Sequence, residues 1–439
     1  MTDIVTSRAT GVKAGASRRH FLKLSGTAAL FSAAKAALPA GAFAQAAGPE
    51  VKGTRLGYIA LTDAAPLVIA KEKGLFAKHG VPDMDIAKQA SWGATRDNMA
   101  LGLKANGIDG GHILRPKTHL YATGKVMQNG QPLPMYTLLN LNEDSQAISV
   151  ANEYKELDVR KDASALKAAF EKKRAAGKEL TAAMTFPGGT HDLWIRYWFA
   201  AGGIDPDSDL KLIVVPPPQM VANMKVGNMD CFCVGDPWHE QLVNQNIGYT
   251  AVTTGELWAK HPEKILGMRA DFVDANPKAT QAILMAVMEA QAWADKMENK
   301  QELAEIVGRR QWFNVPVADI IGRLKGDINY GNGRTAKAPE LAMKFWGEGG
   351  AVSYPWKSLD TWFVTENIRW GKFDANIDIK ALVDKTNRSD LWLEAAKTLG
   401  VAGVPASDSR GVETFFDGVK FDPAAPMDYL KALKIKRVA

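Results

Sequence analysis

The fold class of this chain is decided by a strand, a turn and a helix that follow one another directly: Glu179-Leu180-Thr181-Ala182-Ala183-Met184-Thr185-Phe186-Pro187-Gly188-Gly189-Thr190-His191. The first eight residues predict a strand, and a helix is predicted from His191 to Ala201. A glycine turn that opens into a helix leaves free backbone N–H groups at the positive end of the helix dipole, which favours anions. The stretch therefore predicts an α/β unit with an anion-binding turn.

The same alternation extends on both sides of this unit. Further strands are predicted at 54–61, 84–88, 134–141, 146–150, 210–215 and 249–253, and helices at 66–74, from 93 onward, at 163–177 and at 277–297. Asp63 is placed where it could cap the helix that follows it. Alternating strands and helices predict open, mostly parallel sheets with helices on both faces.

The N-terminal segment has the pattern of an export signal. Ser17-Arg18-Arg19-His20-Phe21-Leu22-Lys23 precedes a mildly apolar stretch and the small-x-small sequence Ala42-Phe43-Ala44, which a signal peptidase recognises. This segment resembles a twin-arginine signal peptide, which implies export of an already folded protein to the periplasm. An apolar run of about eleven residues is too short for a bilayer core, which needs roughly twenty. We therefore expect residues 1–44 to be removed.

The signal segment also explains the basic character of the chain. The 439 residues carry a formal net charge of +6, but six of the 54 basic residues and only one of the 48 acidic residues lie in positions 1–44. The remaining chain is nearly neutral, with a net charge of about +1. A nearly neutral chain gives no support for nucleic-acid binding. Its length is enough for two compact domains.

The two cysteines, Cys231 and Cys233, lie two positions apart on a predicted strand, so their side chains point to the same face. This geometry suits a disulfide poorly, and we expect buried free thiols. No CxxC, HExxH or His-rich cluster is present, so no metal and no cofactor is predicted.

Several stretches together resemble the nitrate- and bicarbonate-binding family of ABC-importer substrate-binding proteins, and the nitrate branch in particular. They are Gly74-Leu75-Phe76-Ala77-Lys78-His79-Gly80, Ser91-Trp92-Gly93, Gln146, Phe186-Pro187-Gly188-Gly189-Thr190-His191, Gly235-Asp236-Pro237-Trp238 and His261-Pro262-Glu263-Lys264-Ile265-Leu266-Gly267-Met268-Arg269-Ala270-Asp271. The resemblance covers about residues 54–385. It implies a type II periplasmic binding protein with two α/β lobes, two crossover strands and a ligand in the cleft between the lobes.

From this resemblance we expect crossovers near residues 140–148 and 258–268. Lobe 1 would then comprise residues 50–145 and 265–439, and lobe 2 residues 146–264. The resemblance further implies a monomeric, non-enzymatic periplasmic protein that binds nitrate or nitrite and delivers it to an ABC permease in the inner membrane.

By motif, the ligand-binding residues of the family correspond here to Trp92, Gln146, Thr190, His191, Gly235 and Lys264. Nitrate only accepts hydrogen bonds, so its site should be rich in donors and poor in carboxylates. An indole, an amide, a hydroxyl, an imidazole and an ammonium can donate, and Gly235 lets the backbone approach the ligand closely. Lys264 would supply the one full charge.

Two other functions remain open at this stage. Bicarbonate needs an acceptor for its hydroxyl, and Glu263, next to Lys264, could supply one. A thiamin-pyrimidine-synthase-like enzyme on the same fold is a remote alternative, based on Cys231-Phe232-Cys233. The sequence does not separate nitrate from nitrite.

Overall fold

The computed structural model describes residues 48–435, and the chain divides at Gly48 into two units. The sheets and helices of the fold belong to the second unit, Pro49–Ala439. The expected signal peptide lies outside the described residues. No helix within 48–435 is long and apolar enough to span a bilayer.

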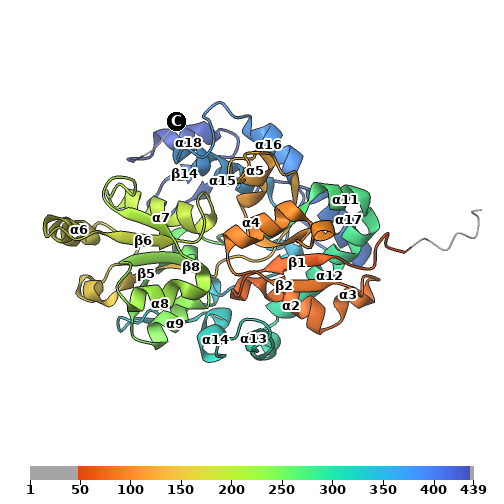
Figure 1. Ribbon diagram of the computed structural model, residues 1–439, viewed down its shortest axis with the longest axis horizontal. Coiled ribbons are helices and arrows are strands. Elements are labelled where there is room, and N and C mark those ends of the chain that lie inside the picture. Colours follow the sequence, from red (N-terminus) through yellow and green to blue (C-terminus); the bar gives the residue numbers. More distant parts are fainter. Residues whose placement is uncertain (1–47, 436–439) are drawn as a thin grey trace, which may run out of the picture. The chain divides into compact units, whose positions relative to one another are not determined.

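Two five-stranded mixed sheets organise this unit, and Figure 1 shows them in different parts of the ribbon. The first sheet has the order β2-β1-β3-β10-β4, with β1 (Arg55–Tyr58), β2 (Asp85–Lys88), β3 (Gly110–Leu114), β4 (Met135–Asn140) and β10 (Lys264–Arg269). The second has the order β7-β6-β8-β5-β9, with β5 (Gln146–Ala151), β6 (Thr181–Met184), β7 (Lys211–Val214), β8 (Cys231–Gly235) and β9 (Gly248–Thr253).

In each sheet four strands run in the same direction, and one antiparallel strand enters directly after a crossover. β5 lies antiparallel between β8 and β9, and β10 lies antiparallel between β3 and β4. The chain therefore passes between the sheets twice, between Asn140 and Gln146 and again between Thr253 and Lys264. The predicted α/β class with two lobes is confirmed, and each sheet is mixed only through its crossover strand, β10 or β5.

Helices pack on both sheets. The long predicted helix is α12 (Pro277–Asp295), which begins with Pro at its first position and packs on α2 (Ala65–Glu72). The others are α3 (Leu75–Lys78), α4 (Trp92–Leu101), α5 (Lys117–Ala122), α6 (Ala165–Ala175), α7 (Thr190–Ala201), α8 (Met220–Lys225), α9 (Trp238–Asn244), α10 (Thr254–Leu257), α11 (Ala270–Ala275), α13 (Lys300–Gly308), α14 (Ala318–Lys325), α15 (Lys357–Arg369), α16 (Ile379–Thr386), α17 (Ser389–Leu399) and α18 (Pro426–Lys431). Two short hairpins complete the fold, β11 (Asp327–Asn329) with β12 (Thr335–Lys337) and β13 (Glu413–Thr414) with β14 (Lys420–Phe421).

The C-terminal part of the chain packs on both lobes. α17 contacts α12 and β4, whereas α15 contacts α7 of the second lobe. There Trp362 stacks on Trp194 with ring centroids 5.2 Å apart. This packing differs from the expectation that residues 265–439 extend lobe 1 alone, because the aromatic face of α15 fits the aromatic face of α7.

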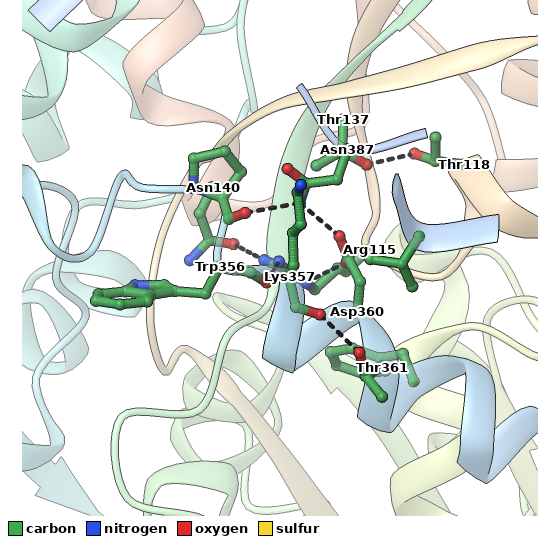
Figure 2. Close-up of polar contacts among 12 residues, drawn as sticks. Arg115, Thr118, Thr137, Asn140, Trp356, Lys357, Asp360, Thr361 and Asn387 are labelled. Atoms are coloured by element: carbon green, nitrogen blue, oxygen red, sulfur yellow. Dashed lines mark hydrogen bonds and ion pairs between the residues drawn. The ribbon is translucent and has the colours of Figure 1, made fainter. Parts of the chain in front are cut away.

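A buried ion pair fixes this tail to the first sheet (Figure 2). Arg115, directly after β3, lies 2.8 Å from the Asp360 carboxylate of α15, and both side chains are fully buried. Arg115 also donates to Asn140 Oδ1 at 2.8 Å, and Asn387 Nδ2 donates to the second Asp360 oxygen at 2.7 Å. Hydrogen bonds to both partners make this burial of charge tolerable.

Asp360→Ala should therefore lower the free energy of unfolding by about 3–5 kcal/mol, because it leaves the Arg115 guanidinium buried without its anion. Urea denaturation followed by circular dichroism measures this loss. Lys380→Ala is the control, since it removes the exposed Lys380–Asp384 pair and should change stability little. Equal effects of the two substitutions would contradict this account.

Candidate functional site

Three of the predicted site residues meet where the crossovers enter the sheets. Gln146 is the first residue of β5 and pairs directly with Gly235, the last residue of β8. Directly opposed residues of an antiparallel pair point their side chains to the same face. A Cβ on Gly235 would lie 3.6 Å from Lys264 Nζ. The amide of Gln146 therefore points to the same side of the sheet as the Lys264 ammonium.

The turn that follows β6 brings Thr190 and His191 to the same place. Gly188 has a φ of +71°, which a glycine adopts without strain, and its N–H donates to Asp192 Oδ2 at 2.7 Å. Thr190 is the first residue of α7, so the free N–H groups of the helix lie beside it. His191 Nε2 lies 2.9 Å from Glu263 Oε1, next in the chain to Lys264.

Trp92 comes from the first lobe. It is the first residue of α4, and the Ser91 side chain caps this helix by accepting a hydrogen bond from Ala94 N at 3.0 Å. The centroid of its ring lies 5.8 Å from Lys264 Nζ and 5.3 Å from the ring of His112. Residues from both lobes and both crossovers thus surround the Lys264 ammonium.

Lys264 is shared by two buried carboxylates. Its Nζ donates to Asp63 Oδ2 at 2.8 Å and also to Glu263 Oε2. Asp63 Oδ1 lies 2.6 Å from His112 Nε2, and all four side chains are fully buried. An ammonium has three N–H donors, so one donor of Lys264 is still available for a ligand.

Three sequence-based expectations are corrected by this arrangement. The site is not poor in carboxylates, because the charge of Lys264 is balanced by Asp63 and Glu263. Asp63 does not cap a helix, since its carboxylate faces Lys264 and His112. His191 has no free ring nitrogen, because Nδ1 lies 2.5 Å from Thr185 Oγ1 and Nε2 contacts Glu263.

Burial sets the ionisation of these groups. Burial opposes ionisation of Asp63, but Lys264 and His112 outweigh it and lower its pKa. The pKa of Glu263 is raised, because burial and the neighbouring Asp63 charge outweigh Lys264. The pKa of His191 is lowered well below its usual range, first by burial and then by Lys264, so this ring is neutral. The pKa values of the two carboxyl groups that share Lys264 are thus shifted in opposite directions.

Several buried polar atoms around Lys264 have no hydrogen-bond partner among residues 48–435. They include Trp92 Nε1, the Gln146 amide nitrogen and oxygen, Thr190 Oγ1, Thr62 Oγ1 and Ser145 Oγ. Buried polar groups in proteins are almost always paired, since an unpaired one costs about 1–3 kcal/mol. Five of these six atoms are hydroxyl or N–H donors, and the sixth is the amide oxygen of Gln146. Hydrogen-bond acceptors are what these donors lack.

Lys117 is a second buried cation that the sequence did not suggest. Its Nζ donates to the Trp92 carbonyl at 2.9 Å and lies 3.9 Å from the centroid of Phe186 and 4.8 Å from that of Trp92. Within residues 48–435 it forms no ion pair with a carboxylate. Burial lowers its pKa well below the usual value, and Lys264 adds to this effect. The aromatic faces stabilise the ammonium between the two lobes.

No group of three or more His, Cys, Asp or Glu side chains within residues 48–435 is arranged to hold a metal ion. Cys231 and Cys233 are buried, free and on β8, as predicted. Burial raises the pKa of both thiols well above the ordinary value, which disfavours the reactive thiolate.

Both cysteines should therefore resist a water-soluble thiol reagent in the native protein and react fully in denaturant. Ellman's reagent added with and without urea measures this difference. Rapid titration of two thiols in native buffer would contradict the buried placement.

This chain is similar to a known protein family and to proteins named for the anions that they bind. A family model described as the NMT1-like family matches residues 47–308. The nitrate/nitrite binding protein NrtA of Synechococcus elongatus is 57% identical over 391 residues, covering 89% of this chain and 88% of that protein. The bicarbonate-binding protein CmpA of the same organism is 46% identical over 398 residues, covering 88% of each.

A solved structure agrees over the same range. The crystal structure of the periplasmic nitrate-binding protein NrtA from Synechocystis PCC 6803 superposes with a TM-score of 0.86 at 57% identity, covering 89% of this chain and all of that one. The chain therefore belongs to the NMT1-like family, within the group of nitrate- and bicarbonate-binding proteins, and has their two-lobe fold.

Proposed function

We propose that this protein captures nitrate or nitrite in the periplasm and delivers it to an ABC importer. The observation that carries the proposal is the set of buried, unpaired donors around Lys264, namely Trp92 Nε1, the Gln146 amide and Thr190 Oγ1. A planar anion that only accepts hydrogen bonds matches such a set. The relatives named nitrate/nitrite binding protein, at 55–57% identity, support the same anion.

In this proposal the six predicted residues have different tasks. Lys264 contributes the available ammonium donor, and a charged donor in a dry site binds more strongly than a neutral one. Trp92, Gln146 and Thr190 donate from their side chains. Gly235 keeps space open, because a Cβ there would lie 3.1 Å from Asp63 Oδ2. His191 acts indirectly by holding Glu263 beside Lys264.

Capture needs movement and no chemical step. We expect the lobes to open and close about the two crossovers, residues 141–145 and 254–263, with the closed form recognised by the permease. Asp144 and Ser145 in the first crossover have φ values of +60° and +89°. A positive φ costs free energy for residues other than glycine. We expect a monomer with no enzymatic activity.

A transport partner is supported by the family. The nitrate import ATP-binding protein NrtC of Synechocystis is 34% identical over 383 residues, which cover 87% of this chain and 55% of that protein. A module like this one therefore occurs inside an ATP-binding import protein. The twin-arginine-like segment supports export of this chain to the periplasm.

Bicarbonate is the second candidate ligand, because Glu263 and Asp63 lie beside Lys264. An ionised carboxylate could accept the hydroxyl proton of bicarbonate, which nitrate lacks. Both carboxylates, however, already accept from Lys264. The unpaired groups are mostly donors, and this favours nitrate.

Lys264→Ala should weaken nitrate binding roughly a hundredfold, since losing a charged partner of a buried hydrogen bond costs about 2–5 kcal/mol. Isothermal titration calorimetry with nitrate, nitrite, bicarbonate and sulfate measures both the affinity and the choice of anion. The control is Lys260→Ala, which removes an exposed lysine of the same crossover. Unchanged nitrate affinity in Lys264→Ala, or a preference for bicarbonate, would overturn the proposal.

Export should depend on the arginine pair. Replacing Arg18 and Arg19 together by lysine preserves the charge but removes the twin-arginine pattern, so the protein should stay in the cytoplasm. Cell fractionation followed by immunoblotting detects this change, and Arg8→Lys is the control. Normal periplasmic accumulation of the double variant would contradict the assigned route.

A further inference from the structure

We propose that Glu263 holds a proton whenever the oxyanion is bound, so that anion capture at alkaline pH takes one proton from solution. This inference rests on the proposed function, because it concerns the same site. It begins from the fully buried chain His112–Asp63–Lys264–Glu263–His191.

The buried carboxyl groups of this chain outnumber the ammonium that they share. Asp63 and Glu263 together, if both ionised, outweigh the single ammonium that they share, and the histidines at either end are neutral. A monovalent anion placed beside this group would add a second uncompensated negative charge in a site without solvent. Like charges in such surroundings repel strongly, and one carboxyl group then takes up a proton. Protonation of one carboxyl leaves one excess negative charge, which the buried ammonium of Lys117, against the same Trp92 ring as Lys264, offsets.

Glu263, and not Asp63, is the carboxyl group that takes up the proton. Asp63 accepts from Lys264 Nζ at 2.8 Å and lies 2.6 Å from His112 Nε2, and both contacts stabilise its ionised form when His112 carries its proton on Nε2. Glu263 Oε1 faces His191 Nε2 at 2.9 Å, and the other nitrogen of this ring faces Thr185 Oγ1 at 2.5 Å. A neutral His191 can accept from a protonated Glu263 and donate from Nδ1 to Thr185. A proton on Glu263 thus has an acceptor in His191 Nε2, whose ring is held by Thr185 through its other nitrogen, whereas His112 Nδ1 has no such partner within residues 48–435.

The other charged and titratable groups around Glu263 do not replace it. His261, two residues before it, has its pKa lowered well below the usual value, first by burial and then by Lys264. Cys233 on β8 has a raised thiol pKa. Asp144 in the first crossover, whose pKa burial raises to about 8, and Lys117 are two other groups near the site that can titrate in the alkaline range. Loss of the Lys117 proton would also weaken anion binding, so the experiment must separate Lys117 from Glu263.

The sign of the linkage follows from the raised pKa of Glu263. Below the pH at which it ionises in the empty site, the proton is already present and affinity is constant. Above that pH, each binding event must take up a proton, and affinity falls by about tenfold per pH unit. Nitrate itself carries no titratable proton in this range, so any proton taken up belongs to the protein.

The test is calorimetry of nitrate binding in buffers of different ionisation enthalpy, from pH 6 to pH 9.5. The wild-type protein should take up almost no proton at the acidic end and close to one at the alkaline end. Glu263→Gln mimics the protonated side chain, so it should bind nitrate with a pH-independent affinity and without proton uptake. An infrared band of a protonated carboxyl group in the nitrate complex should be absent from this variant.

Two matched variants serve as controls. Glu240→Gln alters a carboxyl group of α9 whose pKa burial also raises, to about 7, but which lies outside the site. It should keep the full proton uptake, and so should Lys117→Met. If uptake persists in Glu263→Gln and disappears in Lys117→Met, the proton belongs to Lys117 and the inference is wrong.

The remaining outcomes are distinct. Tight nitrate binding whose affinity does not change up to pH 9.5, with no proton uptake, would overturn this inference alone. Absence of nitrate binding at every pH would overturn the proposed function and this inference with it. If Glu263→Gln does not fold, the number of protons taken up by the wild-type protein and by Lys117→Met still decides the question.

Discussion

The shared hydrogen bonding of Lys264 is the interaction on which this structure depends. Asp63, in the turn between β1 and α2, and Glu263, in the second crossover, accept from the ammonium, and His191 of α7 contacts Glu263. One cation thereby connects elements of both sheets at a single buried point. Buried charges are expensive unless they are paired, so the closed arrangement of the lobes and the ionisation of the site depend on each other.

In contrast to these paired charges, the unpaired donors around Lys264 lower the stability of the fold. Trp92, Gln146 and Thr190 each hold a polar group away from water without a partner within residues 48–435. Such groups lower stability and are retained where they serve recognition. Anion selectivity follows from these donors, because a ligand that cannot accept hydrogen bonds from several of them at once gains little binding free energy.

The sequence predicted those features that depend on neighbouring residues. The β6–turn–α7 unit, the helix α12 and the buried thiols of β8 all follow from local pattern. β3 was missed because Gly110 and Gly111 weaken the strand pattern, and β10 because it lies where only a crossover was expected. Asp63 was mistaken for a helix cap, since its partners His112 and Lys264 are 49 and 201 residues away in the chain. Lys117 has no motif at all, and only the packing of aromatic rings from two lobes identifies it.

The insertion of β10 between β3 and β4 has a consequence for biosynthesis. β3 and β4 are made early, but the strand that joins them emerges from the ribosome only after the whole second sheet. Until β10 is made, β3 and β4 therefore have unpaired edges, which are prone to mispairing. Long-range pairing of this kind is slow to form. A newly made chain thus needs protection until residue 269 has been added, and a delivery system that accepts only finished proteins would suit its late-closing sheet.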